Sequence, residues 1–156
     1  MSTAAPAPTA PSCPDCGDAS SRWFRPGPPE DRPQVGSPED AAEVVRPCLR
    51  GLDREHCLIV PLDTKHRLIG LRTVSVGTAD HTFMAPREVY RDALLVGASA
   101  IFVAHNHPSG DATPSADDRQ ITRRLAQAGA TVGVELLDHL VVGDPGWVSL
   151  ARLGVL

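Results

Sequence analysis

Two histidines and an aspartate are placed where they could hold a metal ion together. His105 and His107 follow directly on the apolar run 100–104, and Asp118 lies eleven residues after His107. Side chains at i and i+2 of a strand point to the same side, roughly 7 Å apart along the backbone, so both imidazoles can reach one ion. Two imidazoles and one carboxylate leave a fourth tetrahedral position for water, which is typical of a catalytic rather than a structural zinc site.

Each of these residues also has a structural interpretation. A histidine at a strand end can be a polar terminus only, and Asp118 could simply favour the N-terminus of a helix. Ser115 is well placed as an N-cap, and Asp117 could replace Asp118 if spacing were the only guide. The combination of H-x-H, a following proline and then S-x-x-D favours a metal site over these separate interpretations.

The elements that would position these groups follow from hydrophobic periodicity. The apolar run 100–104 is typical of a central strand buried on both faces, and open α/β sheets place ligand sites at the carboxyl ends of such strands. A helix is predicted from Pro114 to Gly129, where the glycine ends it. Other helices are predicted over 37 to about 51 and 85 to about 96, and other strands over 57–62, 68–77 and part of 131–142. This alternation predicts an α/β domain with a mixed central β-sheet flanked by helices.

Proline content divides the 156-residue chain into two parts. Eight of the 15 prolines fall within residues 1–36, and neither leucine nor isoleucine occurs before Leu49. Such a stretch buries too little apolar surface to offset the entropy of ordering it. We therefore predict a flexible tail over 1–36 and one compact domain over 37–156. Cys13 and Cys16 in the tail lack a second pair of ligands and are interpreted as solvated thiols.

Charge and hydropathy narrow the class of protein. With 15 basic and 19 acidic residues the net charge is −4, which argues against nucleic acid as a partner. The longest uncharged apolar run, 93–104, is shorter than the ~18 residues of a membrane span. The start of the chain has no signal-peptide pattern. The expectation is a cytoplasmic protein without a membrane partner.

The motif residues resemble those of a known enzyme family. His105-Asn106-His107-Pro108 with Ser115-Ala116-Asp117-Asp118 fits the H-x-H-x(7)-S-x-x-D core of the JAMM (MPN+/JAB) metalloproteases. The wider stretch 105–111, together with 86–89 and 138–143, is similar to the RadC branch of bacterial JAB-domain proteins. The resemblance implies a single JAB/MPN-type domain over 37–156, with a cytidine-deaminase-like architecture.

The same resemblance implies a set of roles. His105, His107 and Asp118 would bind one Zn²⁺ per chain, and Glu55, just before the first strand, would act as general base. Ser115 would donate a hydrogen bond to the oxyanion of the tetrahedral intermediate. The implied function is a zinc-dependent metallopeptidase or isopeptidase that cleaves an amide bond of a protein or peptide. Glu88 is the fallback for the base, although its place in the first turn of a helix already explains it.

Other functions and residues were weighed as alternatives. A RadC-like accessory of DNA repair and a non-catalytic interaction module both stay open. A zinc nucleobase deaminase is excluded because it needs H-x-E where this chain has His105-Asn106-His107. His139 is either a support for the site or a structural histidine, and Asp111 is interpreted as a turn residue. No role is assigned to His56, His66 and His81.

Overall fold

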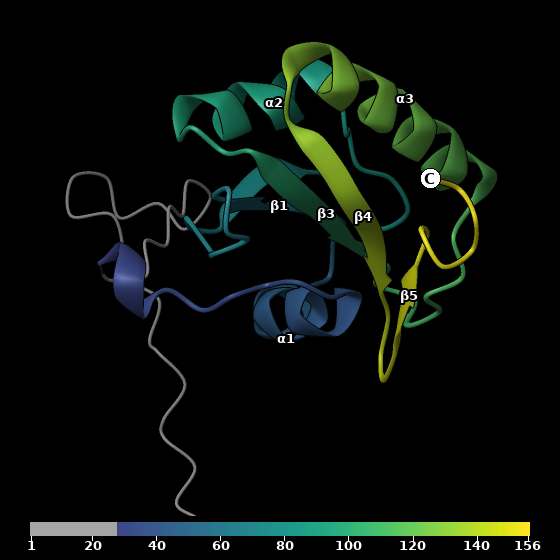
Figure 1. Ribbon diagram of the computed structural model, residues 1–156. Coiled ribbons are helices and arrows are strands. Elements are labelled where there is room, and N and C mark those ends of the chain that lie inside the picture. The colour runs from purple at the N-terminus through teal and green to yellow at the C-terminus, as the bar shows by residue number, and fades with distance from the viewer. Residues whose placement is uncertain (1–27) are drawn as a thin grey trace, which may run out of the picture.

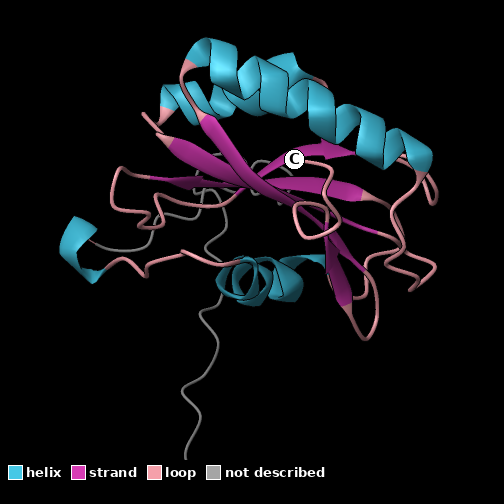
Figure 2. Ribbon diagram, turned by 45° about the vertical axis from the view of Figure 1, so that its right-hand side comes forward, coloured by secondary structure: helices cyan, strands magenta, loops and turns pink. Residues whose placement is uncertain are grey.

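A five-stranded sheet lies between helices in this computed structural model, which describes residues 28–156 (Figures 1 and 2). The cysteine pair Cys13 and Cys16 lies outside the described residues, as does most of the predicted tail. The strands are β1 (His56–Leu62), β2 (Arg72–Val76), β3 (Ala100–Asn106), β4 (Glu135–Val142) and β5 (Trp147–Ser149). The helices are α1 (Pro38–Leu49), α2 (Pro86–Leu95) and α3 (Ala116–Val132), after a short 3-10 turn at Pro29–Asp31.

The sheet is mixed, as predicted. Its strand order is β2-β1-β3-β4-β5, and β3 lies in the centre. β3 and β4 run parallel, whereas the pairs β1–β2, β1–β3 and β4–β5 are antiparallel. Every residue of β3 is buried, in agreement with its uninterrupted apolar sequence.

Two separate cores cover the two faces of the sheet. Helix α1 packs on one face with Leu58, Phe102 and Leu140, and helices α2 and α3 pack on the other with Ile59 and Val103 (Figure 2). Adjacent residues of a strand point to opposite faces, so β1 and β3 contribute alternately to the two cores. This alternation decides which side chains of β1 and β3 meet α3.

Helices α1 and α3 begin in the same way. Ser37 and Ser115 are N-caps whose side chains accept a hydrogen bond from the backbone N–H three residues on. The residues in that position are Asp40 and Asp118, and their carboxylates accept a hydrogen bond from the backbone N–H of the cap serine. Each helix therefore starts with a capping box that satisfies two otherwise unpaired donors.

The structure corrects the predicted end of the third helix. Helix α3 passes through Gly129 and ends at Gly133, which has the left-handed φ of +77° typical of a helix C-terminus. Gly129 has another reason to be glycine. A Cβ there would lie 2.4 Å from both the Tyr90 hydroxyl and the Val134 carbonyl oxygen, so the residue permits close packing of α2 and the chain after α3.

Two other boundaries also differ from the predictions. Val35, assigned from the sequence to the tail, is buried in the core beside α1 and donates its backbone N–H to the carbonyl of His66. The strand predicted over 68–77 is regular only in β2, because Leu68 pairs back onto Leu62 through an isolated bridge.

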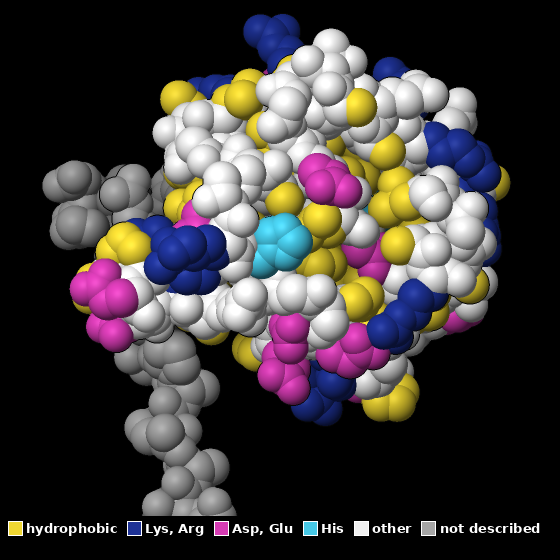
Figure 3. Space-filling view, viewed as in Figure 1, with side chains coloured by type: hydrophobic (Ala, Val, Ile, Leu, Met, Phe, Trp, Pro, Cys, Tyr) yellow, Lys and Arg dark blue, Asp and Glu magenta, His cyan; other side chains and the backbone are white. Residues whose placement is uncertain are grey.

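The described residues contain no helix long and apolar enough to cross a membrane. On the face shown in Figure 3, acidic and basic side chains are interspersed rather than gathered into areas of one sign.

Candidate metal centre

The candidate site lies at the carboxyl end of β3, on the face covered by α2 and α3. Ile101 and Val103 point into the core on that face, so His105 and His107, two and four residues further on, point the same way. Asp118, in the first turn of α3, is brought against them by the loop over 108–114. The three side chains predicted from spacing therefore meet, and their ligand atoms lie within 4.8 Å of one another.

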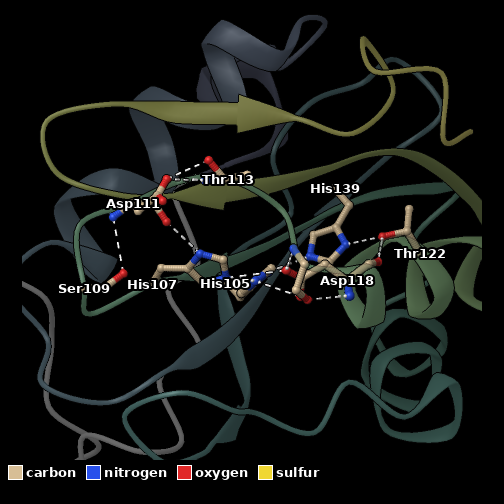
Figure 4. Close-up of polar contacts among 9 residues, drawn as sticks. His105, His107, Ser109, Asp111, Thr113, Asp118, Thr122 and His139 are labelled. Carbon is tan, nitrogen blue, oxygen red and sulfur yellow. Dashed lines mark hydrogen bonds and ion pairs between the residues drawn. The ribbon is translucent and has the colours of Figure 1, made fainter.

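The contacts within this cluster are short (Figure 4). The Nε2 atoms of His105 and His107 are 3.1 Å apart. Asp118 directs one carboxylate oxygen to each of them, with Oδ1 3.2 Å from His105 Nε2 and Oδ2 3.5 Å from His107 Nε2. His105 is fully buried, and the His107 side chain is 15% exposed, so the cluster is closed on one side and reachable on the other.

The tautomer of His107 is set by its second ring nitrogen. Nδ1 lies 2.8 Å from the backbone carbonyl oxygen of Asp111. A carbonyl can only accept, so Nδ1 carries the proton and donates it. In the neutral ring, Nε2 then presents a lone pair to the cluster. Asp111 is thus more than a turn residue, because its carbonyl orients a candidate ligand.

The tautomer of His105 is set through a longer chain of hydrogen bonds. The Thr122 hydroxyl donates its only proton to the carbonyl oxygen of Asp118, at 2.6 Å, so it can only accept from Nδ1 of His139, also at 2.6 Å. Nε2 of His139 is then an acceptor, and it receives the Nδ1 proton of His105 at 2.8 Å. The Nε2 of His105 is left with a lone pair, as in His107.

Neutral rings in these tautomers would place two lone pairs 3.1 Å apart beside a carboxylate. Three electron-rich groups at such distances repel one another unless a cation lies among them. A proton on His107 can partly take the place of that cation. The hydrogen bond to Asp118 raises the pKa of His107, although burial opposes the rise. Burial alone would raise the pKa of Asp118, but the two histidine rings, which donate to its carboxylate when they are protonated, hold that pKa well below its usual range. The donor set thus fits a metal ion, and the cluster could bind one.

His139 reaches the site because of an irregularity between β3 and β4. Ile101 pairs with Leu136 but Phe102 pairs with Asp138, so the register shifts by one residue. A shift of one residue exchanges the faces to which later side chains point. His139 consequently shares the face of Val103 and His105, where it is fully buried, and burial with the nearby charge of His105 holds its pKa well below the usual value.

Asp118 and Ser115 serve both helix and cluster. The Asp118 carboxylate accepts the Ser115 backbone N–H at 2.7 Å while it faces the two histidines. The Ser115 oxygen accepts the Asp118 backbone N–H at 3.0 Å, which leaves its hydroxyl hydrogen to donate elsewhere. The neighbouring Asp117 is exposed and does not belong to the cluster.

Glu55 lies beside the cluster, directly before the neighbouring strand β1. Cys57 pairs with His105, so continuing this antiparallel register places Glu55 opposite His107 and on the same face. Its side chain is 7% exposed and lines the same cleft as His107. Burial raises the pKa of Glu55, although the charges of His105 and His107 oppose the rise. Glu88, the fallback, is exposed on α2 next to Arg87 and does not line the cleft.

The cleft over these residues has a volume of about 600 Å³. One side is polar and is formed by Glu55, His107, Ser115 and Asp118. The rest of the lining mixes polar residues with apolar ones, and among the apolar ones Phe83 is 75% exposed. The arrangement therefore offers a cluster that could bind an ion, a carboxyl group of raised pKa and a hydroxyl donor at the edge of a groove.

Some residues that build the site carried no clear signal in the sequence. Thr122 reads as an ordinary helix residue, and the role of His139 depends on the register shift described above, which periodicity does not reveal. In the sequence, Asn106 is only the variable residue of the H-x-H motif, and no role was predicted for it. His56, His66 and His81 lie outside the ion-binding cluster.

Comparison with known proteins agrees with this geometry. A family model described as a RadC-like JAB domain matches residues 35–155. A UPF0758 protein of Desulfitobacterium hafniense is 43% identical over 125 residues, covering 80% of this chain and 55% of the relative. A UPF0758 protein of Shouchella clausii is 46% identical over 123 residues, covering 79% and 54%. The chain thus spans about half the length of these curated relatives.

Proposed function

The chain belongs to the RadC-like JAB domain family, and from that premise we propose that it is a zinc-dependent hydrolase of the JAMM type. Its substrate would be an amide bond in a protein or peptide. The observation that carries the proposal is the pair of imidazole lone pairs facing the Asp118 carboxylate. Such a set of two imidazoles and one carboxylate matches the preference of Zn²⁺, with a fourth position left for water.

His105, His107 and Asp118 would hold the ion. When bound there, Zn²⁺ acts as a Lewis acid that lowers the pKa of water to about 7. Glu55 would accept the proton that water loses on attack and deliver it to the leaving amine. Its raised pKa suits the first of these steps, because the carboxylate takes up a proton more readily than an exposed glutamate does.

Ser115 would stabilise the transition state. Its hydroxyl hydrogen is not used in the helix cap, so it can be donated to the oxygen of the attacked carbonyl as negative charge develops there. The exposed Phe83 side chain, which lines the cleft, would contact apolar residues that flank the scissile bond of a peptide.

The test has two stages. Purified protein is dialysed against zinc and analysed for bound metal, and we expect one zinc per chain that is lost in His107→Ala and in Asp118→Ala.

The zinc-loaded protein is then incubated with a library of internally quenched fluorescent peptides, in linear and lysine-branched forms. Glu55→Gln should keep its zinc and lose at least about 100-fold in turnover, the usual contribution of a general base. Full turnover by Glu55→Gln would remove Glu55 from the mechanism, and absence of zinc from the wild type would end the proposal.

A further inference from the structure

Asn106 lies between the two candidate histidine ligands but points away from them. It follows His105 on β3, so its side chain lies on the face opposite the cluster. It is only 3% exposed. An asparagine so deeply buried needs partners for its carboxamide, because an unpaired amide in a protein interior is costly.

Both ends of the carboxamide bind the backbone that flanks Glu55. The Asn106 Oδ1 accepts the backbone N–H of His56 at 2.7 Å, and its Nδ2 donates to the carbonyl oxygen of Arg54 at 2.9 Å. The side chain thus bridges the residue before Glu55 and the residue after it. The regular pairing of β1 with β3 ends at Cys57 and His105, and the carboxamide continues it by one residue.

The backbone of Glu55 itself is held from the other side. Its N–H donates to the carbonyl of Thr78 at 2.8 Å, and its carbonyl accepts the N–H of Gly77 at 2.7 Å. Gly77 packs so tightly that a Cβ there would lie 1.8 Å from the His81 carbonyl oxygen. Among the hydrogen bonds described for residues 54–56, those of Asn106 therefore tie this segment to β3, the strand that carries the histidines.

We infer that Asn106 is a positioning residue that fixes the Glu55 carboxylate relative to the metal cluster. The inference rests on the proposed function for what Glu55 does, but the placement of Glu55 can be tested without it. Asn106 joins the segment of Glu55 to the peptide between His105 and His107, so base and ligands move as one unit. The site needs a donor and an acceptor together, which the amide supplies and which neither an ionised aspartate nor leucine supplies.

The first test is a double-mutant cycle in the zinc-loaded protein, with the linear or branched fluorescent peptide that the wild type cleaves best. Asn106→Asp keeps the acceptor for His56 but sets a carboxylate oxygen against the Arg54 carbonyl. We expect kcat to fall at least 10-fold, with KM and zinc content unchanged. In a Glu55→Gln background the same substitution should cause no further loss, because Asn106 acts through Glu55. A full 10-fold loss in that background would overturn the inference.

The matched control is Ser99→Ala. The Ser99 hydroxyl also donates to a backbone carbonyl of β1, that of Leu62, but at the far end of the β1–β3 pair. This variant loses a comparable hydrogen bond and should keep wild-type kcat. A 10-fold loss in Ser99→Ala as well would mean that Asn106 acts only through the stability of the strand pair.

A second measurement does not depend on turnover. Side-chain NMR relaxation of Glu55 should report larger amplitudes of motion in Asn106→Asp and unchanged amplitudes in Ser99→Ala. If the wild type binds zinc and cleaves no peptide while Glu55 becomes mobile in Asn106→Asp, the proposed function fails and the positioning role stands. If Glu55 stays equally rigid in both variants, the positioning role is refuted whatever the activity.

Discussion

At the scale of single residues, the properties of the site depend on which ring nitrogens of His105 and His139 carry a proton. Thr122 has one hydroxyl hydrogen and gives it to the Asp118 carbonyl, and this fixes the protonation of His139 and then of His105. A partner beyond the ligand shell that holds an imidazole in its metal-binding tautomer typically changes metal affinity by 10- to 100-fold. This series of hydrogen bonds starts at the Asp118 carbonyl and ends at the His105 ring, so both of its ends lie on residues of the cluster.

The first prediction concerns Thr122. Thr122→Val keeps the shape of the side chain but leaves Nδ1 of His139 without its acceptor, so zinc affinity should fall by about 10-fold. Competition with a chelator measures this directly. The control is Thr131→Val, because Thr131 also donates to the carbonyl four residues earlier on α3 but is exposed and remote from the cluster. Equal affinities for the two variants would contradict the proton assignment.

The second prediction is the pH dependence of zinc binding. A metal needs the neutral ring of His107, and the hydrogen bond to Asp118 raises the pKa of that ring above its ordinary 6.5. Affinity should therefore be complete above the raised pKa and fall as pH drops through it, by up to about 10-fold per pH unit for each proton displaced. Titrations with zinc at about pH 8 and about pH 6 test this, and a constant affinity over that range would refute it.

Sequence reasoning identified the ligands but not their support. His105, His107 and Asp118 were found because residue type, strand periodicity and a helix start agree at one place. Asn106 escaped, and His139 was left between a support and a structural histidine, because both roles depend on the register of neighbouring strands, which local periodicity does not reveal. Glu55 was found only through the resemblance, since a glutamate before a strand is otherwise unremarkable.

At the scale of elements, two helices with matching N-termini allow the structural role of a cap serine to be tested apart from the proposed catalytic role. Ser37 and Ser115 make equivalent capping boxes, but only Ser115 lines the cleft. Replacing an N-cap serine by alanine costs about 1 kcal/mol of folding free energy. Both Ser37→Ala and Ser115→Ala should show this loss in denaturant titrations.

The third prediction is that only one of these variants affects peptide cleavage. Ser115→Ala should lower kcat by about 10²-fold, the scale of a lost oxyanion donor, with KM little changed. Ser37→Ala should cleave at the wild-type rate. Wild-type turnover by Ser115→Ala would assign Ser115 to the helix cap alone.

Helix and strand boundaries were predictable where local rules decide them. Ser37 and Pro38 mark the start of α1 correctly, because capping and proline geometry are local. Gly129 was misread as the end of α3, because its reason for being glycine is contact with Tyr90 rather than chain termination. Packing between elements overrode the local signal there.

At the scale of the whole molecule, the cluster joins two layers. His105 and His107 belong to the sheet, whereas Asp118 belongs to α3, so an ion held by all three connects the central strand to the helical layer. Any ligand that binds only the folded state stabilises it by mass action.

The fourth prediction follows from this bridge. Zinc at about 100 times its Kd should add about 2.7 kcal/mol to the free energy of unfolding. For a domain of this size the gain corresponds to a rise of roughly 5–10 °C in Tm. Thermal unfolding followed by circular dichroism with and without zinc measures it. Asp118→Ala should show no rise, and a rise of equal size in that variant would place the ion elsewhere.

The loop over 77–83 connects the backbone of Glu55 with the mouth of the cleft. It begins with the two backbone hydrogen bonds to Glu55 and reaches Phe83, whose ring stands in solvent at the rim and whose carbonyl is anchored by Ser75. Under the proposed function, a polypeptide substrate would meet the Phe83 ring at the mouth of the cleft. One short stretch of backbone thus carries both that ring and the hydrogen bonds that hold the candidate base in place.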